Sequence, residues 1–334
     1  MKIVCVALDV PLPTLFDYAA SDLRDGDIGR RVLVPFGKKI AVGVIMACAD
    51  STDVEPERLR RVLSIQRDVP PLPADVRSLL KFSSDYYHHP LGEVVLNALP
   101  TRLRRRQPIK LAAKEAFGLT EAGRSIDVGS FPPRAKIRRA VLALLRNTEP
   151  AVHAARLYSL APGARAVVND FAKRAWIEPS AAAVTATTPT PAQRVAGPEL
   201  SAQQSAVLKT VREAGEGFVP WLLRGVTGSG KTEVYLQLIA DALERGKQAL
   251  VLVPEINLTP QLEALIRARF PATTLIALHS GLSEGERLHG WLSAQSGEAA
   301  IVLGTRLAIF TPLPKLGLIV IDEEHDASYK QVDG

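Results

Sequence analysis

The sequence predicts a multidomain α/β protein, and three observations support this fold class. The chain has 334 residues, which is too long for one ordinary hydrophobic core. Residues 179–198 consist mainly of alanine, threonine and four prolines, a composition that buries too little apolar surface to fold. From residue 199 onward, short apolar runs alternate with segments of helical periodicity, as in a parallel sheet covered by helices. We therefore expect folded units at 1–105, 111–178 and 199–334, with 179–198 as a linker.

The composition is that of a globular protein, with 47% hydrophobic and 23% charged residues. No apolar run approaches the ~20 residues that cross a membrane, and the first residues lack the apolar core of a signal peptide. We therefore expect a cytoplasmic protein that does not contact a membrane. Cys5 and Cys48 lie within apolar runs and are predicted to be buried free thiols. Two cysteines build neither a disulfide framework nor a zinc site, so no zinc is expected in this chain.

Charge is distributed unevenly along the chain. Counting Lys and Arg against Asp and Glu gives +4 for residues 1–110, +6 for 111–198 and −4 for 199–334. The basic surplus therefore lies in the first two units, which is typical of modules that bind a polyanion such as DNA. Solvated charge without a partner is an equally good explanation of the charge alone.

The first unit is predicted to be rich in β-structure. Apolar bursts at 3–7, 31–35 and 40–45 are separated by turn signals and indicate three strands. A helix is expected over Ala74 to Tyr87, and an arginine-rich run at 102–106 is expected to be a solvated segment that leaves the domain.

The second unit is predicted to be small and helical. Helices are expected at 134–146 and 164–175, with a shorter helix between them and an extended segment at 176–178. This order is the skeleton of a winged helix, although any three-helix bundle gives similar spacing.

The third unit contains the pattern G-x-x-x-x-G-K-[ST], which cradles phosphates in many nucleotide-binding proteins. An apolar run at 218–223 precedes it and is predicted to be a buried strand, and a helix is expected to follow as far as Gly246. Lys231 would reach the β- and γ-phosphates of ATP, and Thr232 would offer its hydroxyl to Mg²⁺. The predicted nucleotide-binding residues are Gly225, Val226, Thr227, Gly228, Ser229, Gly230, Lys231 and Thr232.

Further strands and helices of this unit follow in alternation. Strands are expected at 248–253, 275–278, 299–303 and 316–321. Thr259 and Pro260 are predicted to begin a helix that runs to Phe270, and Ser283 with Glu286 forms a capping box for a helix that ends at Gln295.

The last of these strands is followed directly by two acidic residues, Asp322 and Glu323. Ligands of open α/β sheets bind at the carboxyl ends of the strands. Asp322 is therefore predicted to bind Mg²⁺ opposite Thr232, and Glu323 to orient and deprotonate the attacking water. A solvated acidic loop is the alternative.

The chain resembles the superfamily 2 DNA helicases, and more narrowly the family of primosomal replication-restart helicases. The segments that carry this resemblance in the third unit are Gly225–Thr232, Val253–Gln261, His279–Leu282, Gly304–Arg306 and Asp322–Gln331. Those in the first unit are Pro11–Pro13, Phe16–Tyr18, Val34–Lys38, Asp85–Pro90 and Ala98–Pro100. The resemblance is looser in the second unit.

The resemblance implies roles for residues that no local pattern identifies. It places the 3′ end of a DNA strand in a pocket of the first unit, lined by Phe16, Asp17, Tyr18 and Gly37. It also expects a basic residue there, and Arg60 and Arg61 are equal candidates. Core packing is the alternative for Phe16 and Tyr18.

In the motor unit, the resemblance assigns adenine recognition to Gln204. The family carries Asn where this chain has Ser201 and an acid where it has Gln203. Thr305 and Arg306 would contact phosphates of the tracked single strand, and His325 would couple nucleotide state to DNA contact.

The implied protein is an ATP-dependent 3′→5′ DNA helicase that binds forks, D-loops and single-stranded DNA and promotes primosome assembly. Its implied partners are the single-stranded-DNA-binding protein and other primosome proteins. The family continues with a Ser-Ala-Thr strand, a second RecA-like lobe and a zinc module, so an incomplete RecA-like lobe without ATPase activity of its own is expected here. The alternatives are a non-catalytic fork-binding fragment and another superfamily 2 translocase.

Overall fold

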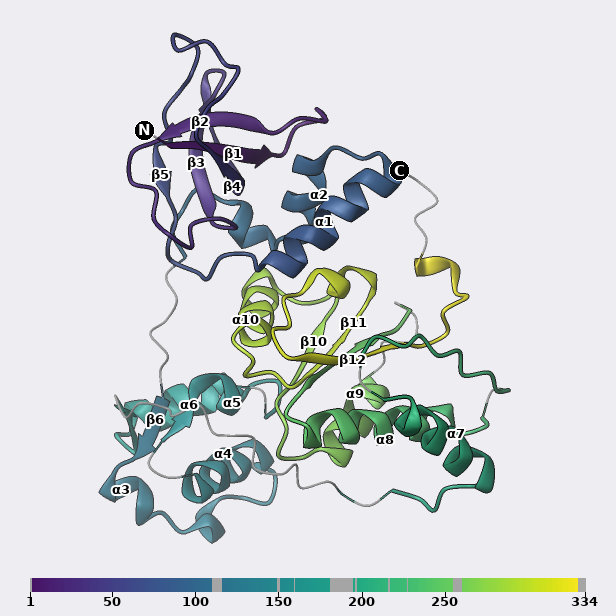
Figure 1. Cartoon of the computed structure of the whole chain (residues 1–334). Coiled ribbons are helices and arrows are strands. Elements are labelled where there is room, and N and C mark those ends of the chain that lie inside the picture. Colours follow the sequence, from purple (N-terminus) through teal and green to yellow (C-terminus); the bar gives the residue numbers. More distant parts are fainter. Residues whose placement is uncertain are drawn as a thin grey trace.

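The computed structural model describes residues 2–109, 116–148, 151–158, 160–180, 195, 197–215, 217–226, 228–254 and 260–329. These residues form three sheets, each with its own helices (Figure 1). Among the helices of the described ranges, none is long and apolar enough to cross a membrane.

The first sheet is antiparallel and has the strand order β2-β1-β4-β3-β5. Its strands are β1 (Lys2–Leu8), β2 (Phe16–Ala20), β3 (Arg31–Phe36), β4 (Lys39–Ala49) and β5 (Ser64–Ile65). The three strands expected from apolar bursts are present. The other two were not expected, because β5 has only two residues and β2 carries an aspartate beside its aromatic side chains.

Two helices cover one face of this sheet. Helix α1 (Ala74–Tyr87) has the expected bounds, and α2 (Leu91–Ala98) leads into a 3₁₀ turn, η1 (Thr101–Arg104). Alternation along β1 sends Val4, Val6 and Leu8 into one apolar cluster, whereas Ala7 packs with Val95 of α2 on the opposite face. Gly92 permits the close approach of α2 to β1, because a Cβ there would collide with the carbonyl oxygen of Leu8.

The second unit has a three-stranded sheet in the order β7-β6-β8. Its elements are β6 (Ala116–Leu119), α3 (Glu121–Arg124), η2 (Val128–Ser130), α4 (Lys136–Asn147), β7 (Val152–His153), α5 (Ala154–Tyr158), α6 (Ala164–Lys173) and β8 (Ile177–Ser180). The expected order of helix, shorter helix, helix and extended segment is present as α4, α5, α6 and β8. Residues 179 and 180 were expected to belong to the linker, but they are part of β8, which pairs with β6 as far as Ser180. Residues 181–194 lie outside the described part of the chain.

The third unit has a parallel sheet in the order β10-β11-β9-β12. Its strands are β9 (Gln248–Leu252), β10 (Leu275–Leu278), β11 (Ile301–Gly304) and β12 (Leu316–Ile321). Its helices are α7 (Ala202–Glu213), α8 (Lys231–Glu244), α9 (Pro260–Arg269) and α10 (Glu284–Gln295), with the 3₁₀ turns η4 (Arg306–Phe310) and η5 (Ala327–Tyr329). The expected capping box of Ser283 and Glu286 begins α10, whereas Thr259 lies outside the described residues.

One expected strand of this unit is absent. The run 218–223 pairs with no strand, and its apolar side chains face solvent, with Phe218 92% and Leu222 70% exposed. Strand β12 is at the edge of the sheet, and within the described residues its outer side stays unpaired. A strand needs a paired neighbour to satisfy its backbone groups. Leu316, Ile319 and Ile321 of β12 are likewise 40–49% exposed.

The first and third units share a hydrophobic core through α10. Leu288 and Trp291 of α10 are buried in the same cluster as Leu80 of α1 and Leu103 of η1. At the margin of this contact, Arg105 pairs with Glu284 at 2.6 Å and the amide of Gln295 donates to the carbonyl of Pro71 at 2.8 Å. The expectation that the arginine-rich run is solvated is therefore wrong for its central part. The guanidinium of Arg104 also binds the carbonyl of Leu99.

The cysteines are free thiols, but the expected burial is wrong. Cys5 is partly buried and Cys48 is exposed. Cys48 lies near the end of β4, where consecutive residues of the strand become solvent-exposed.

Candidate functional site

The phosphate-loop pattern forms a turn that opens into a helix. Gly228 and Gly230 have positive φ angles of 80° and 81°, which side-chain-bearing residues rarely adopt, and Gly230 is the N-cap of α8. Helix α8 has 14 residues, so its N-terminus presents free N–H groups and a partial positive charge beside the loop. Thr227 lies outside the described residues. Anion binding at this turn follows from its geometry even though the preceding segment is not a strand.

Two predicted catalytic side chains approach each other across this turn. The Nζ of Lys231 lies 3.8 Å from Oε1 of Glu323, and it also donates to the carbonyl of Gly225 at 2.9 Å. Lys231 comes from the start of α8 and Glu323 from the end of β12, so the fold joins residues 92 positions apart. Glu323 has a φ of 45°, a left-handed conformation that is uncommon for a residue with a side chain and that costs free energy unless its surroundings hold it.

Asp322 is held by the backbone and by two tyrosines. Its N–H donates to the carbonyl of Leu252, which fixes it at the carboxyl end of the sheet. The hydroxyl of Tyr235 lies 3.4 Å from Oδ1, and the hydroxyl of Tyr329 donates to the Asp322 carbonyl at 2.8 Å. Burial and then the neighbouring charge of Glu323 raise the pKa of Asp322 above its usual value. Burial raises the pKa of Tyr235 to about 12, so this hydroxyl remains a donor.

Gln204 lies next to the phosphate loop. Its amide nitrogen donates to the carbonyl of Gly230 at 3.1 Å, and its amide oxygen accepts from the N–H of Ser201. Ser201 is the N-cap of α7 and forms a capping box with Gln204. Ser and Asn are equally favoured N-caps, so the departure from the family at this position preserves the helix start. The structure places Gln204 beside the loop and leaves adenine recognition a prediction.

The residues predicted to contact single-stranded DNA lie at the end of β11. Thr305 is 8% exposed and precedes η4, and its N–H donates to the carbonyl of Leu278. Arg306 is half-buried and donates to the carbonyl of Ser328 at 3.4 Å, which links this turn to the segment after Asp322. Arg306 is therefore the more accessible of the two to a DNA phosphate. His325 lies 3.7 Å from Glu323 and is largely exposed.

A buried ion pair that was not predicted ties α8 to α9. The carboxylate of Glu233 accepts from both terminal nitrogens of Arg269, at 2.8 and 2.5 Å, and from the amide of Gln237. Glu233 stands two residues after Lys231, so the pair fixes the start of α8. The end of the expected linker reaches the same place, because Val195 donates to the Arg269 carbonyl. Spacing along the chain gives no signal for such a pair.

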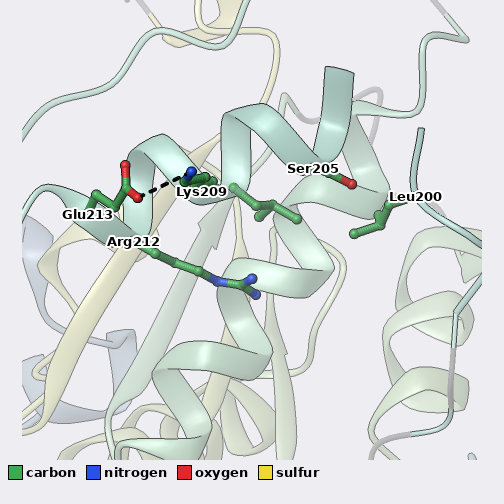
Figure 2. Close-up of a pocket in the computed structure, with 6 residues that line it drawn as sticks. Leu200, Ser205, Lys209, Arg212 and Glu213 are labelled. Atoms are coloured by element: carbon green, nitrogen blue, oxygen red, sulfur yellow. Dashed lines mark ion pairs between the residues drawn. The ribbon is translucent and has the colours of Figure 1, made fainter. Parts of the chain in front are cut away.

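A shallow depression of about 350 Å³ runs along α7 (Figure 2). Lys209 and Glu213 form an ion pair at 3.8 Å on its wall, and the remaining lining residues are Leu200, Ser205, Leu208 and Arg212. Arg212 pairs with Asp241 of α8 at 2.7 Å. None of the lining residues belongs to the phosphate loop or to the Asp322 segment, so this depression is not the phosphate site.

A second depression, of about 260 Å³, lies in the first unit at the edge strand β2. Its lining residues are Leu15, Phe16, Asp17, Tyr18, Val54, Arg58 and Arg60. Three of the four residues predicted for the 3′-end pocket are therefore together, and Gly37 joins them because its carbonyl accepts from Arg60 at 2.9 Å. Between the two candidate arginines, the structure places Arg60 in this depression and not Arg61.

The aromatic residues of this pocket are also packing residues. Tyr18 is 4% exposed, belongs to the core of the sheet and donates to the carbonyl of Pro35 at 3.1 Å. Phe16 packs edge-to-face on Phe36 with ring centroids 5.2 Å apart. The Tyr18 hydroxyl is thus engaged within the protein, and Asp17 and Arg60 are the charged side chains of the predicted set at the pocket.

Sequence reasoning missed Val54, Arg58 and Thr52 in this region. They lie in the irregular loop after β4, where no periodicity indicates which side chains turn inward. Thr52 stands behind Asp17 and donates to its Oδ2 at 2.6 Å.

In the second unit, two arginines of α4 are engaged within the protein. Arg138 pairs with Asp170 of α6 at 3.1 Å, and Arg139 donates to the carbonyl of Phe131. Arg139 therefore supports the packing of this unit, and Arg138 is only partly available to a polyanion.

Residues 5–100 match the PriA 3′DNA-binding domain (3′BD), and residues 190–333 match the DEAD/DEAH box helicase family. Replication restart protein PriA of Haemophilus influenzae is 38% identical over 348 aligned positions that cover 100% of this chain and 46% of that protein. The PriA protein of Synechocystis sp. is 32% identical over 92% of this chain and 45% of its own length. The chain thus spans about half the length of these curated relatives.

These matches define the class of protein. The parallel sheet and the phosphate loop lie within the residues that match the DEAD/DEAH box helicase family, and the depression at β2 lies within those that match the 3′DNA-binding domain. The combination of both domains, together with relatives aligned along the whole chain, identifies the family. The chain belongs to the PriA family of replication restart proteins.

Proposed function

We propose that this chain carries the DNA-binding units and the first motor lobe of an ATP-dependent 3′→5′ DNA helicase that restarts stalled replication forks. The observation that carries this proposal is the approach of Lys231 to Glu323 at the phosphate loop, in a chain that also has a pocket around Asp17. A motor and a strand-end receptor on one chain suit an enzyme that loads at a fork.

In this proposal the motor residues divide the work of ATP hydrolysis. The loop amides and Lys231 bind the phosphates, and Lys231 neutralises charge that develops on the γ-phosphate. Glu323 accepts a proton from the attacking water. Its conformation at the strand end directs the carboxylate toward Lys231 and therefore toward the phosphates.

The residues present fit Mg²⁺. Thr232 is exposed at the start of α8, and Asp322 offers a carboxylate at the end of β12, so both supply the oxygen ligands that Mg²⁺ prefers. Within the described residues no group of three or more His, Cys, Asp or Glu could hold a metal. One carboxylate and one hydroxyl together with nucleotide phosphates is the usual Mg²⁺ arrangement of such motors, in which the ion neutralises phosphate charge.

The proposed DNA contacts are of three kinds. The pocket around Asp17 receives a 3′ end, since a carboxylate accepts a hydrogen bond from a 3′-hydroxyl and repels a phosphate. Arg306 contacts phosphates of the tracked strand without reading sequence. The second unit acts as a winged helix on a duplex arm of the fork. Partners such as the single-stranded-DNA-binding protein follow from the resemblance.

We further propose that the chain by itself hydrolyses no ATP. The segment 218–226 is exposed and unpaired, so the phosphate loop is anchored on only one side, by α8. A misplacement of ~1 Å can reduce a rate ~100-fold. An arginine finger from a second lobe contributes ~10³–10⁵ in comparable enzymes, and the resemblance places it beyond these residues.

The test is an ATPase assay with and without forked DNA on this chain and on a longer chain that includes a second lobe. We expect DNA to stimulate ATP turnover only by the longer chain, and we expect Lys231→Ala to abolish that turnover. Turnover by the short chain that disappears with Lys231→Ala would contradict the proposed inactivity. A longer chain that remains inactive on every DNA structure would contradict the helicase assignment.

The exposed 218–226 segment also favours a second candidate function. A chain with an unpaired phosphate-loop segment can bind fork DNA without hydrolysing ATP. Fork affinity that is unchanged by Lys231→Ala and by nucleotide would support this non-catalytic role.

A further inference from the structure

The Asp17 carboxylate is bound by Thr52, a residue that is not among those lining the pocket. The hydroxyl of Thr52 donates to Oδ2 of Asp17 at 2.6 Å, the shorter of the two contacts that this hydroxyl makes. Its oxygen also accepts from the N–H of Val54 at 3.1 Å. The bond from Val54 occupies a lone pair of the Thr52 oxygen and not its proton. The single proton of the hydroxyl is therefore donated to Asp17.

A protonated thiol lies beside Asp17 on the sheet. Cys5 and Asp17 are directly opposite in the β1–β2 register, so their side chains lie side by side on one face. Burial first, and then a hydrogen bond to Asp17, raise the pKa of Cys5 to about 11. The thiol is therefore protonated at neutral pH and places no second negative charge beside the carboxylate, which Thr52 binds from the loop.

Two basic side chains at the pocket compete for the Asp17 carboxylate, so its orientation decides which partner it binds. Asp17 is the acidic lining residue, whereas Arg58 and Arg60 are basic. Arg60 is fixed by its bond to Gly37, and Arg58 pairs with Glu55 at 3.2 Å. Without a fixed position, an aspartate carboxylate would turn toward these cations instead of accepting a hydrogen bond from a ligand.

We infer that Thr52 is a positioning residue that orients the Asp17 carboxylate so that the pocket selects a DNA end with a free 3′-hydroxyl. The inference rests on the proposed 3′-end function of this pocket. Thr52 contributes specificity and little of the total affinity, since most of the affinity for DNA comes from phosphate contacts.

The experiment uses the full chain and two oligonucleotides that differ only at the last sugar, one with a 3′-hydroxyl and one with a 3′-hydrogen. Binding is measured by fluorescence anisotropy at one fixed salt concentration. The quantity of interest is the ratio of the two affinities, because general damage to DNA binding lowers both equally. The variants are Asp17→Ala, Thr52→Val, Thr52→Ser and the neighbouring control Ser51→Ala.

The inference expects the wild-type chain to prefer the 3′-hydroxyl. Thr52→Val, which keeps the side-chain shape and removes the hydroxyl, should reduce the preference about 3- to 10-fold, the range for one hydrogen bond. Thr52→Ser restores the hydroxyl and should retain the preference, as should Ser51→Ala. In an Asp17→Ala chain, Thr52→Val should change the ratio no further, since both substitutions act on one interaction.

Three outcomes would overturn the inference, and each shows whether the role of Thr52 or the function of the pocket is wrong. If Asp17→Ala removes the preference and Thr52→Val does not, the pocket function stands and the role of Thr52 is wrong. If Thr52→Val and Thr52→Ser lower both affinities equally, Thr52 is structural only. If the wild-type chain shows no preference, the proposed 3′-end function fails and this inference fails with it.

Discussion

Asp27 shows how one buried carboxylate fixes the loop between β2 and β3. It is 1% exposed and binds both Nε and Nη2 of Arg67, at 3.0 and 2.6 Å, as well as Nε of Arg30 at 3.1 Å. The hydrogen bond from Arg67 is the main cause that lowers the pKa of Asp27 below its usual range. A group whose pKa is lowered by folding stabilises the protein above its usual pKa, and this contribution is lost as the pH falls.

We therefore predict that Asp27→Asn destabilises the chain by about 3 kcal/mol at pH 7, since it removes the carboxylate that Arg30 and Arg67 share and leaves Arg67 paired with Asp22 alone. The difference from wild type should begin to shrink below pH ~4, where the Asp27 carboxyl of the unfolded chain takes up a proton, and should vanish once the folded carboxyl is protonated as well. Urea unfolding at several pH values measures both effects. The exposed neighbour Asp25→Asn is the control and should change little. A difference that is constant with pH would contradict the role of the charge.

The pKa of Asp322 is shifted in the opposite direction to that of Asp27. Folding raises its pKa, chiefly by burial, so its contribution is favourable below the usual carboxyl pKa and is lost as the pH rises through the folded value. Without Mg²⁺, an ionised Asp322 beside Glu323 is unfavourable at neutral pH.

We predict that Asp322→Asn raises the Tm of the metal-free chain at pH 7–8, and that the gain disappears at pH values below ~4. Differential scanning fluorimetry with EDTA checks this, with the exposed Glu324→Gln as the control. Addition of Mg²⁺ and a nucleotide should narrow the gap by stabilising only the wild-type site. A lower Tm for Asp322→Asn at pH 8 would contradict the unfavourable charge.

At the scale of elements, α10 is the helix that joins the two larger units. Trp291 is 4% exposed among side chains of both units, whereas Trp221 is 51% exposed in the unpaired segment before the phosphate loop. The same residue type therefore occurs in two opposite environments.

We predict that Trp291→Ala costs about 3–5 kcal/mol in unfolding free energy, as expected for a large aromatic side chain removed from a core. Trp221→Ala should cost well under 1 kcal/mol, because this position loses little buried surface. Chemical denaturation of both variants gives the comparison. Equal effects would mean that the exposed segment is packed in solution or that α10 is not.

Sequence patterns predicted those elements whose signals are local. The capping box of Ser283 and Glu286, the periodic stripe of α1 and the apolar run of β12 each fix an element through neighbours in the chain, and the structure has them with the expected bounds. The run at 218–223 has an equally clear apolar signal and is not a strand, because pairing depends on a distant partner.

The same distinction holds for the sites. The phosphate loop and the Asp322 segment are contiguous motifs, so the sequence identifies their residues and the strand order brings Lys231 to Glu323. The pocket at β2 draws on β2, the turn after β3 and the loop after β4. Only a family resemblance could gather its residues, and a supporting residue such as Thr52, which no motif contains, required the structure.

At the scale of the whole molecule, the chain order differs from the order of packing. The first and third units share one core although the second unit and residues 179–198 lie between them in sequence. The unit that contains the pocket at β2 and the motor lobe are therefore joined through α10 and not only through the intervening chain. A covalent break between the second and third units should leave this contact in place.

We predict that a chain carrying a protease site inserted within residues 181–194 stays together after cleavage. The two pieces should co-elute in size-exclusion chromatography at micromolar concentration, because Leu288 and Trp291 remain buried and the Arg105–Glu284 and Gln295–Pro71 contacts remain at the margin. Trp291→Ala should release the pieces, whereas Trp221→Ala should not. High salt should weaken the association only modestly, since the Arg105–Glu284 ion pair is exposed and the core of the contact is apolar. Separation of the wild-type pieces at low salt would show that α10 packs too weakly to join the 3′DNA-binding domain to the motor. Retention by Trp291→Ala would place the joining contact elsewhere.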